Sequence, residues 1–198
     1  MSSPTDSQIL HALSAATEPS ASTLAQLHDQ LEADASAAGV LDVAYTIVPT
    51  PVGELLIAAT ELGLVRVAYE REHFDSVLAT LSTRISPRVL RAPQRLALVE
   101  QQIREYFAGE RTSFDLALDF RLSAGFRRQV QEHLPTISYG TTQSYKTVAE
   151  LIGNPKAVRA VGSACSTNPL PVVVPCHRVV RTDGSLGGYI GGLTAKTT

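Results

Sequence analysis

The chain has 198 residues, of which 44% are hydrophobic and 18% charged, and its net charge is −2. This is the composition of an ordinary globular protein that can bury a core, and no apolar run reaches the roughly 18 residues that a membrane span needs. Two cysteines are too few for a disulfide framework, and no His and Cys spacing indicates a metal site. The first 40 residues hold no Lys or Arg, so they lack the basic start of a secretory signal. We therefore expect a cytoplasmic protein with no membrane, metal or cofactor.

The net charge hides an uneven distribution along the chain. Residues 1–120 hold 8 Lys/Arg and 16 Asp/Glu, a balance of −8, whereas residues 121–198 hold 9 and 3, a balance of +6. A basic C-terminal part indicates a surface that meets a polyanion, although two parts of a chain can also differ in charge by chance.

Residues 1–40 predict a short helical extension. They are rich in Ala, Ser, Thr and Gln, and Leu24, Leu27 and Leu31 recur at helical spacing. This pattern indicates one or two amphipathic helices or a loosely ordered segment.

The next 80 residues predict a small sheet with helices. Short β-type runs separated by turn signals indicate an antiparallel meander; these runs are 45–51, 53–60 and 64–70. Two helical patterns follow, at 73–85 and 93–108, and Gly109 is placed to end the second. A further extended piece at 114–120 precedes Ser123, which we expect to cap a helix that runs to about 134.

Two short helices in the C-terminal part predict a helix-turn-helix. Ser144 is placed to cap a helix that ends at Gly153-Asn154, and Pro155 suits the first turn of a second helix, through about Ser166. Such a pair is a common way of presenting a helix to DNA, although many helical hairpins bind nothing.

The stretch PVVVPCHRVV, residues 171–180, places one of the two cysteines, Cys176, directly before His177. The pair follows an apolar, β-like run. A thiol beside an imidazole can be a nucleophile beside its base, or a small buried hydrophobe beside an unrelated polar residue. The dipeptide alone leaves both interpretations open.

Three motifs in register, GNPKAVRAVG, PCHRVV and GGYIGGL, resemble the methylated-DNA–protein cysteine methyltransferases, which repair 6-O-alkylguanine. The match runs from about Ser123 to Lys196. Residues 43–120 are similar to the family's N-terminal domain only in their general pattern of a β-meander with helices. The resemblance implies an α/β (α+β) fold in three parts. These are an extension over 1–40 and a small antiparallel-sheet-plus-helix domain over 41–120. The third part, over 121–198, is a mostly helical DNA-binding and alkyl-acceptor domain with the helix-turn-helix.

The resemblance also implies what Cys176 and His177 do. Cys176 would accept the alkyl group, and His177 would act on it through a water molecule. In the family a Glu on the following helix holds this His, but no Asp or Glu follows Asp183 in this sequence. Either the sequence is truncated or another group orients His177.

Five further residues match family positions in the same way. Tyr145 would donate a proton to the leaving oxygen, and Arg159 would fill the stack that a flipped nucleotide vacates. Asn168 corresponds to the asparagine at the hinge between the helical motif and the cysteine loop. Arg178 and Gly191 would lie against DNA.

The implied function is irreversible, stoichiometric transfer of the alkyl group from 6-O-alkylguanine, and potentially from 4-O-methylthymine, in double-stranded DNA to Cys176. The target base is inaccessible inside a duplex, so it would be flipped out. We expect a monomer without a cofactor. Two alternatives stay open: a module that recognises alkylated bases without repairing them, and a cysteine hydrolase that uses Cys176 and His177 on an acyl substrate.

Overall fold

The computed structural model describes residues 19–197, and the chain divides into two units, residues 1–40 and residues 41–198. In the first unit, helix α2 (Ala21–Ala37) begins after Ser20, whose hydroxyl accepts a hydrogen bond from the Thr23 amide at 3.1 Å. The predicted helix is therefore confirmed at the three leucines. The rest of that prediction, on residues 1–18, lies outside the described residues.

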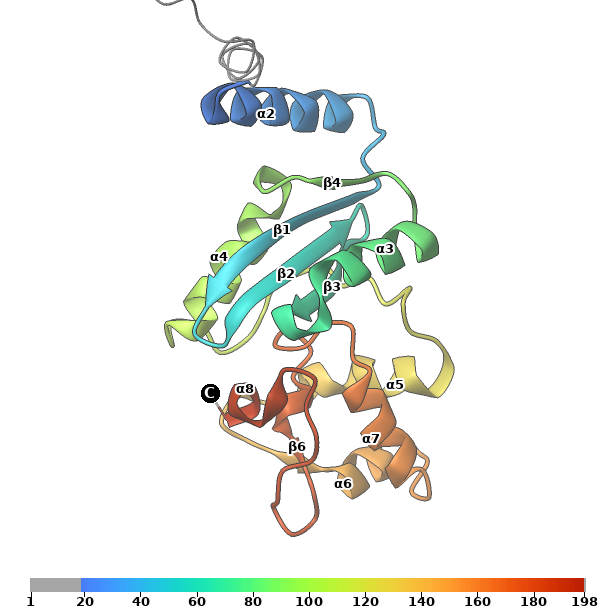
Figure 1. The fold of residues 1–198 in the computed structure, drawn as a ribbon. Coiled ribbons are helices and arrows are strands. Elements are labelled where there is room, and N and C mark those ends of the chain that lie inside the picture. The colour runs from blue at the N-terminus through green and yellow to red at the C-terminus, as the bar shows by residue number, and fades with distance from the viewer. Residues whose placement is uncertain (1–18, 198) are drawn as a thin grey trace, which may run out of the picture. The chain divides into compact units, whose positions relative to one another are not determined.

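The second unit begins with a four-stranded sheet in the order β3-β2-β1-β4 (Figure 1). Its strands are β1 (Val43–Thr50), β2 (Gly53–Thr60), β3 (Gly63–Tyr69) and β4 (Val89–Arg91). The first three pair antiparallel, which confirms the predicted meander, whereas β4 runs parallel to β1 and makes the sheet mixed. The sequence did not reveal β4 because a strand of 3 residues is too short for a periodic pattern.

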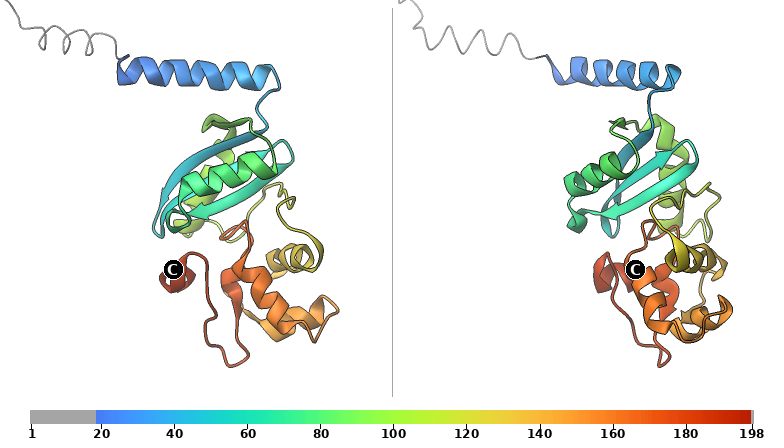
Figure 2. Two further views of the ribbon diagram at one scale, coloured as in Figure 1. Left: turned by 45° about the vertical axis from the view of Figure 1, so that its right-hand side comes forward. Right: turned by 90° about the vertical axis from the view of Figure 1, so that its right-hand side faces the viewer.

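Helices cover both faces of this sheet, with α3 (Phe74–Arg84) on one side and α4 (Ala97–Phe107) on the other (Figures 1 and 2). Strand β2 lies between two neighbours, so both of its faces are buried. Leu56 packs with Leu81 of α3 in one core cluster, while the next residue, Ile57, is buried on the opposite face. This double burial explains why GELLIAAT is apolar without alternation.

The connection to the C-terminal helices agrees with the expected extended piece at 114–120 but departs from the prediction at Ser123. Residues 114–120 form no regular strand in the structure; they contribute a single bridge between Leu118 and Leu64 of β3. Helix α5 (Gly125–His133) begins after Ala124, and Ser123 is buried with no side-chain cap bond. The predicted Ser123 cap is therefore wrong, because the chain turns into the helix after that residue.

The C-terminal half is mainly helical. Its helices are α5, α6 (Tyr145–Leu151), α7 (Val158–Ser166) and α8 (Gly192–Thr197), and both α5 and α6 pack on α7 (Figure 2). Ser144 caps α6 as predicted, since its hydroxyl accepts from the Thr147 amide at 3.0 Å. The helix-turn-helix is present with a longer connection than expected. Pro155 lies in a turn that is closed by a hydrogen bond from the Ala157 amide to the Asn154 carbonyl at 2.9 Å. Helix α7 begins after this turn.

A second, two-stranded sheet joins the start of this motif to the segment after Cys176. Strand β5 (Gln143–Ser144) pairs parallel with β6 (Val179–Val180). Over residues 19–197, no helix is both long and apolar enough to cross a membrane. In the same range no cluster of three or more His, Cys, Asp or Glu side chains is placed to hold a metal ion.

Candidate active site

The apolar run before Cys176 is a buried turn, so the expected β-like run is wrong there. The Val174 amide donates to the Leu170 carbonyl at 2.8 Å, and Val172 has a φ of 73°. A β-branched residue rarely adopts positive φ, so the surroundings must hold it in place. The 3-10 helix η4 (Cys176–Arg178) follows this turn and leads into β6.

Asn168 holds the turn and the thiol together. It is 0% exposed, and its side-chain amide nitrogen donates to the Val174 carbonyl at 2.8 Å and to the Cys176 Sγ at 3.2 Å. Its Oδ1 accepts from the Leu170 amide at 3.0 Å. The residue expected at a hinge thus contacts the sulfur itself.

Burial determines the ionisation of both members of the Cys176–His177 pair. Cys176 is 2% exposed, and burial raises the pKa of its thiol to about 11, although the Asn168 hydrogen bond and the charge of Lys196 act in the other direction. Burial, with the charges of Arg178 and Lys196, lowers the pKa of His177 to about 4. At neutral pH the site therefore holds a thiol beside a neutral imidazole, the form of a histidine that can accept a proton.

The His177 ring bonds to a residue from the N-terminal half. Its Nε2 lies 3.3 Å from the Oη of Tyr106, which belongs to α4. The ring of Tyr189 packs edge-on against the imidazole, with centroids 6.4 Å apart. Sequence reasoning missed Tyr106 because 71 positions separate it from His177 and no local motif marks it.

Lys196 is a second residue that sequence reasoning did not assign to the site. Its ammonium group is buried and donates to the carbonyl oxygens of Val179 at 3.0 Å and Gly187 at 3.3 Å. Burial lowers its pKa, while Cys176 acts to raise it. Helix α8 is thereby tied both to β6, the strand after Cys176, and to the segment 187–191 that precedes α8, which we call the glycine loop.

Tyr145 lies near Cys176 because of the pairing between β5 and β6. Ser144, the residue before it, pairs with Val180, which follows the turn at 170–176 that carries Cys176 (the cysteine turn). The phenol is half-buried, and burial, then Cys165 and Cys176, raises its pKa. A Cβ on Gly187 would overlap the Tyr145 hydroxyl, so this position in the loop leaves room only for glycine.

The other three predicted residues are Arg159, Arg178 and Gly191, of which Arg178 belongs to η4 together with Cys176. Arg159 is exposed in the first turn of α7. Arg178 is half-buried, donates from Nη1 to the Ile137 carbonyl at 2.6 Å and lies 5.6 Å from the centroid of the Tyr139 ring. Gly191 packs against the ring of Tyr69 in β3. The structure thus brings Cys176, His177, Asn168 and Tyr145 together, while contact of the other three with DNA stays a prediction.

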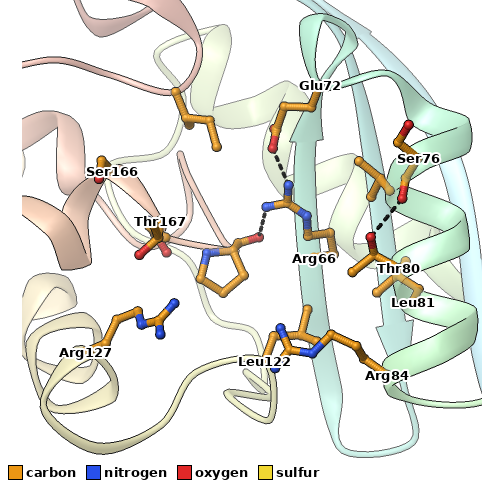
Figure 3. A pocket seen from close by; sticks show the side chains of 14 residues that line it. Arg66, Glu72, Ser76, Thr80, Leu81, Arg84, Leu122, Arg127, Ser166 and Thr167 are labelled. Atoms are coloured by element: carbon orange, nitrogen blue, oxygen red, sulfur yellow. Dashed lines mark hydrogen bonds and ion pairs between the residues drawn. The ribbon is translucent and has the colours of Figure 1, made fainter.

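A cavity of about 380 Å³ lies on the side of Asn168 that faces β3 and α3 (Figure 3). In it Arg66 is ion-paired with Glu72 and donates from Nη1 to the Pro169 carbonyl at 3.3 Å. The Val67 amide donates to the same carbonyl at 2.8 Å. The residue after Asn168 is therefore tied to the edge of the sheet.

Two family models together match most of the chain. Residues 43–120 match the ribonuclease-like domain of 6-O-methylguanine DNA methyltransferase, and residues 125–198 match the DNA-binding domain of 6-O-methylguanine DNA methyltransferase.

Individual relatives agree with these models. The constitutive methylated-DNA–protein-cysteine methyltransferase of Bacillus subtilis is 40% identical over 150 residues, 76% of this chain and 88% of the relative. The bifunctional transcriptional activator/DNA repair enzyme Ada of Escherichia coli is 40% identical over 159 residues, 79% of this chain and 44% of the relative. The crystal structure of Mycobacterium tuberculosis OGT in complex with DNA is similar with a TM-score of 0.66 and 35% identity, covering 77% of this chain and 88% of that one.

Proposed function

Since the chain belongs to the methylated-DNA–protein-cysteine methyltransferase family, we propose that Cys176 is the residue that takes the alkyl group from DNA. The chain is a DNA repair enzyme that acts by direct alkyl transfer. One observation favours Cys176 over Cys165: its sulfur accepts a hydrogen bond from Asn168 at 3.2 Å. The next residue in the chain is also a histidine that is neutral at pH 7. Cys165, by contrast, is buried within α7, where burial raises its pKa to about 12.

In the proposed reaction the thiol proton passes to His177 as the sulfur attacks the alkyl carbon of 6-O-alkylguanine. The new bond joins Sγ to that carbon, and the bond from the carbon to the guanine oxygen breaks. The electron pair of the broken bond stays on the oxygen, and the Tyr145 hydroxyl supplies the proton that neutralises it. A 4-O-methylthymine presents the same kind of carbon–oxygen bond and is the second candidate substrate.

DNA is the partner of the C-terminal half. We assign the contact to α7, where Arg159 is exposed in the first turn, together with the surplus of basic residues in 121–198. The target nucleotide leaves the stack so that its alkyl carbon reaches the buried sulfur. One copy of the chain carries the proposed nucleophile, the proposed base and the proposed DNA-binding helix α7, so the proposed active form is a monomer.

The proposed product limits each chain to one reaction. A thioether has no electrophilic carbonyl for water to attack, and a thiolate is a poor leaving group from an alkyl carbon. No side chain beside Cys176 in the described part of the chain offers a route that returns the thiol. The protein is consumed as it repairs.

Mass spectrometry of the intact protein tests this proposal directly. After incubation with an excess of duplex that contains one 6-O-methylguanine, each chain should gain a single methyl group, located on the Cys176 peptide. Cys176→Ser should gain none, because a hydroxyl is far less nucleophilic than a thiol at neutral pH, while Cys165→Ser should react as the wild type does. Removal of several methyl groups per chain, or a label on Cys165, would contradict the proposal.

A further inference from the structure

The hydrogen bond between α4 and the His177 ring points to a role for Tyr106. Its Oη lies 3.3 Å from His177 Nε2. We propose that Tyr106 is a positioning residue for the alkyl transfer proposed above: its hydroxyl oxygen accepts a hydrogen bond from Nε2–H and thereby selects the ring tautomer that leaves Nδ1 free to accept the thiol proton.

The direction of this hydrogen bond follows from the chemistry of the base. A neutral imidazole carries one proton, so one ring nitrogen donates and the other accepts. If Tyr106 donated to Nε2, the ring proton would be on Nδ1 and neither nitrogen of His177 would have a free lone pair. With Tyr106 as the acceptor, Nδ1 keeps its lone pair, and the imidazolium formed on proton transfer keeps its partner.

The Tyr106 hydroxyl is held in place independently of His177. Its ring packs against three aromatic rings, with centroid distances of 5.6 Å to Phe107, 5.0 Å to Phe114 and 6.1 Å to Tyr139. A side chain locked in this way can orient its partner, because its own rotamer does not have to be selected at the moment of reaction.

The charges around His177 make such an acceptor important. Arg178 and Lys196 both act against protonation of the ring, while the Cys176 thiol and the Tyr189 ring carry no charge at neutral pH. Within residues 19–197 no carboxylate forms a hydrogen bond or ion pair with His177. The Tyr106 oxygen is thus the polar group in position to stabilise the protonated ring.

Tyr106→Phe isolates the hydroxyl, because phenylalanine keeps the ring packing. Tyr139→Phe is the matched control, since it removes a hydroxyl from the same aromatic cluster, whereas the hydrogen bond to His177 is made by Tyr106. We expect Tyr106→Phe to slow single-turnover methyl transfer about tenfold, the range of one net hydrogen bond, while the thermal midpoint falls by no more than about 4 °C. A cavity of about 450 Å³ beside the pair admits water, which keeps the loss moderate. Tyr139→Phe should react at the wild-type rate.

The tautomer of His177, measured by heteronuclear NMR of the imidazole nitrogens, is the readout that a merely structural role would not change. In the wild type the proton should be on Nε2, and in Tyr106→Phe a fraction should move to Nδ1. A wild-type proton on Nδ1, or a Tyr106→Phe protein with the wild-type tautomer and rate, would overturn the inference. If the wild-type protein transfers no methyl group at all, the proposed function fails, whereas the tautomer measurement still decides the role of Tyr106.

Discussion

At neutral pH, burial keeps both members of the Cys176–His177 pair uncharged. The thiol pKa is raised to about 11 and the imidazole pKa is lowered to about 4, so a thiolate–imidazolium pair is disfavoured in the free protein. In the proposed reaction, proton transfer would therefore accompany the attack on the alkyl carbon instead of preceding it. A protonated thiol also reacts slowly with unrelated electrophiles.

The reactivity of Cys176 toward a small alkylating reagent should report this pKa. Because the thiolate is the reactive form, its rate with iodoacetamide should rise about tenfold per pH unit from pH 7 to about 10, since the whole range lies below the folded-state pKa. An ordinary cysteine levels off once pH passes about 8.5. The measurement uses a Cys165→Ala protein and intact mass, with circular dichroism to confirm folding at each pH. A plateau near pH 9 would contradict the raised pKa.

Among the elements, the glycine loop before α8 is shaped by two tyrosines. Gly187 lies against the Tyr145 hydroxyl, and Gly191 lies against the Tyr69 ring, whose hydroxyl is 3.0 Å from that of Tyr189. The loop thus rests on one tyrosine from each half of the second unit. A Cβ on either of these two glycines would overlap a tyrosine, whereas a Cβ on Gly188 would meet nothing within 4 Å.

Gly191→Ala and Gly188→Ala should therefore differ sharply. A Cβ at Gly191 would come within 2.5 Å of the Tyr69 ring, so Gly191→Ala should lower the free energy of unfolding by about 1–3 kcal/mol, the cost of overpacking. Gly188→Ala should change it by less than about 0.5 kcal/mol. Urea denaturation of both variants measures the difference. Equal stabilities would show that the loop moves away from Tyr69 without cost.

At the scale of the whole second unit, Arg66 connects the sheet to the cysteine turn. It is paired with Glu72 and donates to the Pro169 carbonyl, one residue beyond the asparagine that holds the sulfur (Figure 3). The Glu72 carboxylate in turn accepts from the Tyr69 amide at 2.9 Å. Through these hydrogen bonds to Pro169, strand β3 of the N-terminal sheet stabilises the position of Asn168.

Arg66→Ala should loosen this connection. The side chains of Arg66 and Glu72 are 14% and 15% exposed, so removing one partner leaves a mostly buried charge and should destabilise the fold by about 2 kcal/mol. The Val67 amide, bonded to Pro169, should exchange with deuterium faster. The control is Arg88→Ala, which breaks an exposed pair with Asp42 and should change stability by less than about 1 kcal/mol. Unchanged exchange at Val67 in Arg66→Ala would contradict the connection.

Local patterns were sufficient wherever the neighbouring residues decide the conformation. The alternating and apolar runs predicted β1 to β3, and Gly109, with a φ of 76°, ends α4 as expected. The Ser144 cap was correct for the same reason, since its partner is the amide of Thr147. The run before Cys176 was mispredicted because its conformation is set by burial and by the hydrogen bonds of Asn168, not by its β-branched residues.

The sequence by itself determined the family, and it was sufficient to propose Cys176 as the nucleophile, because the motif around Cys176 and His177 is contiguous in the chain. Only the tertiary structure decided which groups surround that pair. Tyr106, 71 positions away, bonds to the histidine, and Lys196 crosses from the last helix to the strand after the cysteine. A buried polar group must be bonded wherever the fold brings a partner, and that partner is chosen by packing in three dimensions, which leaves no periodic or local trace in the chain.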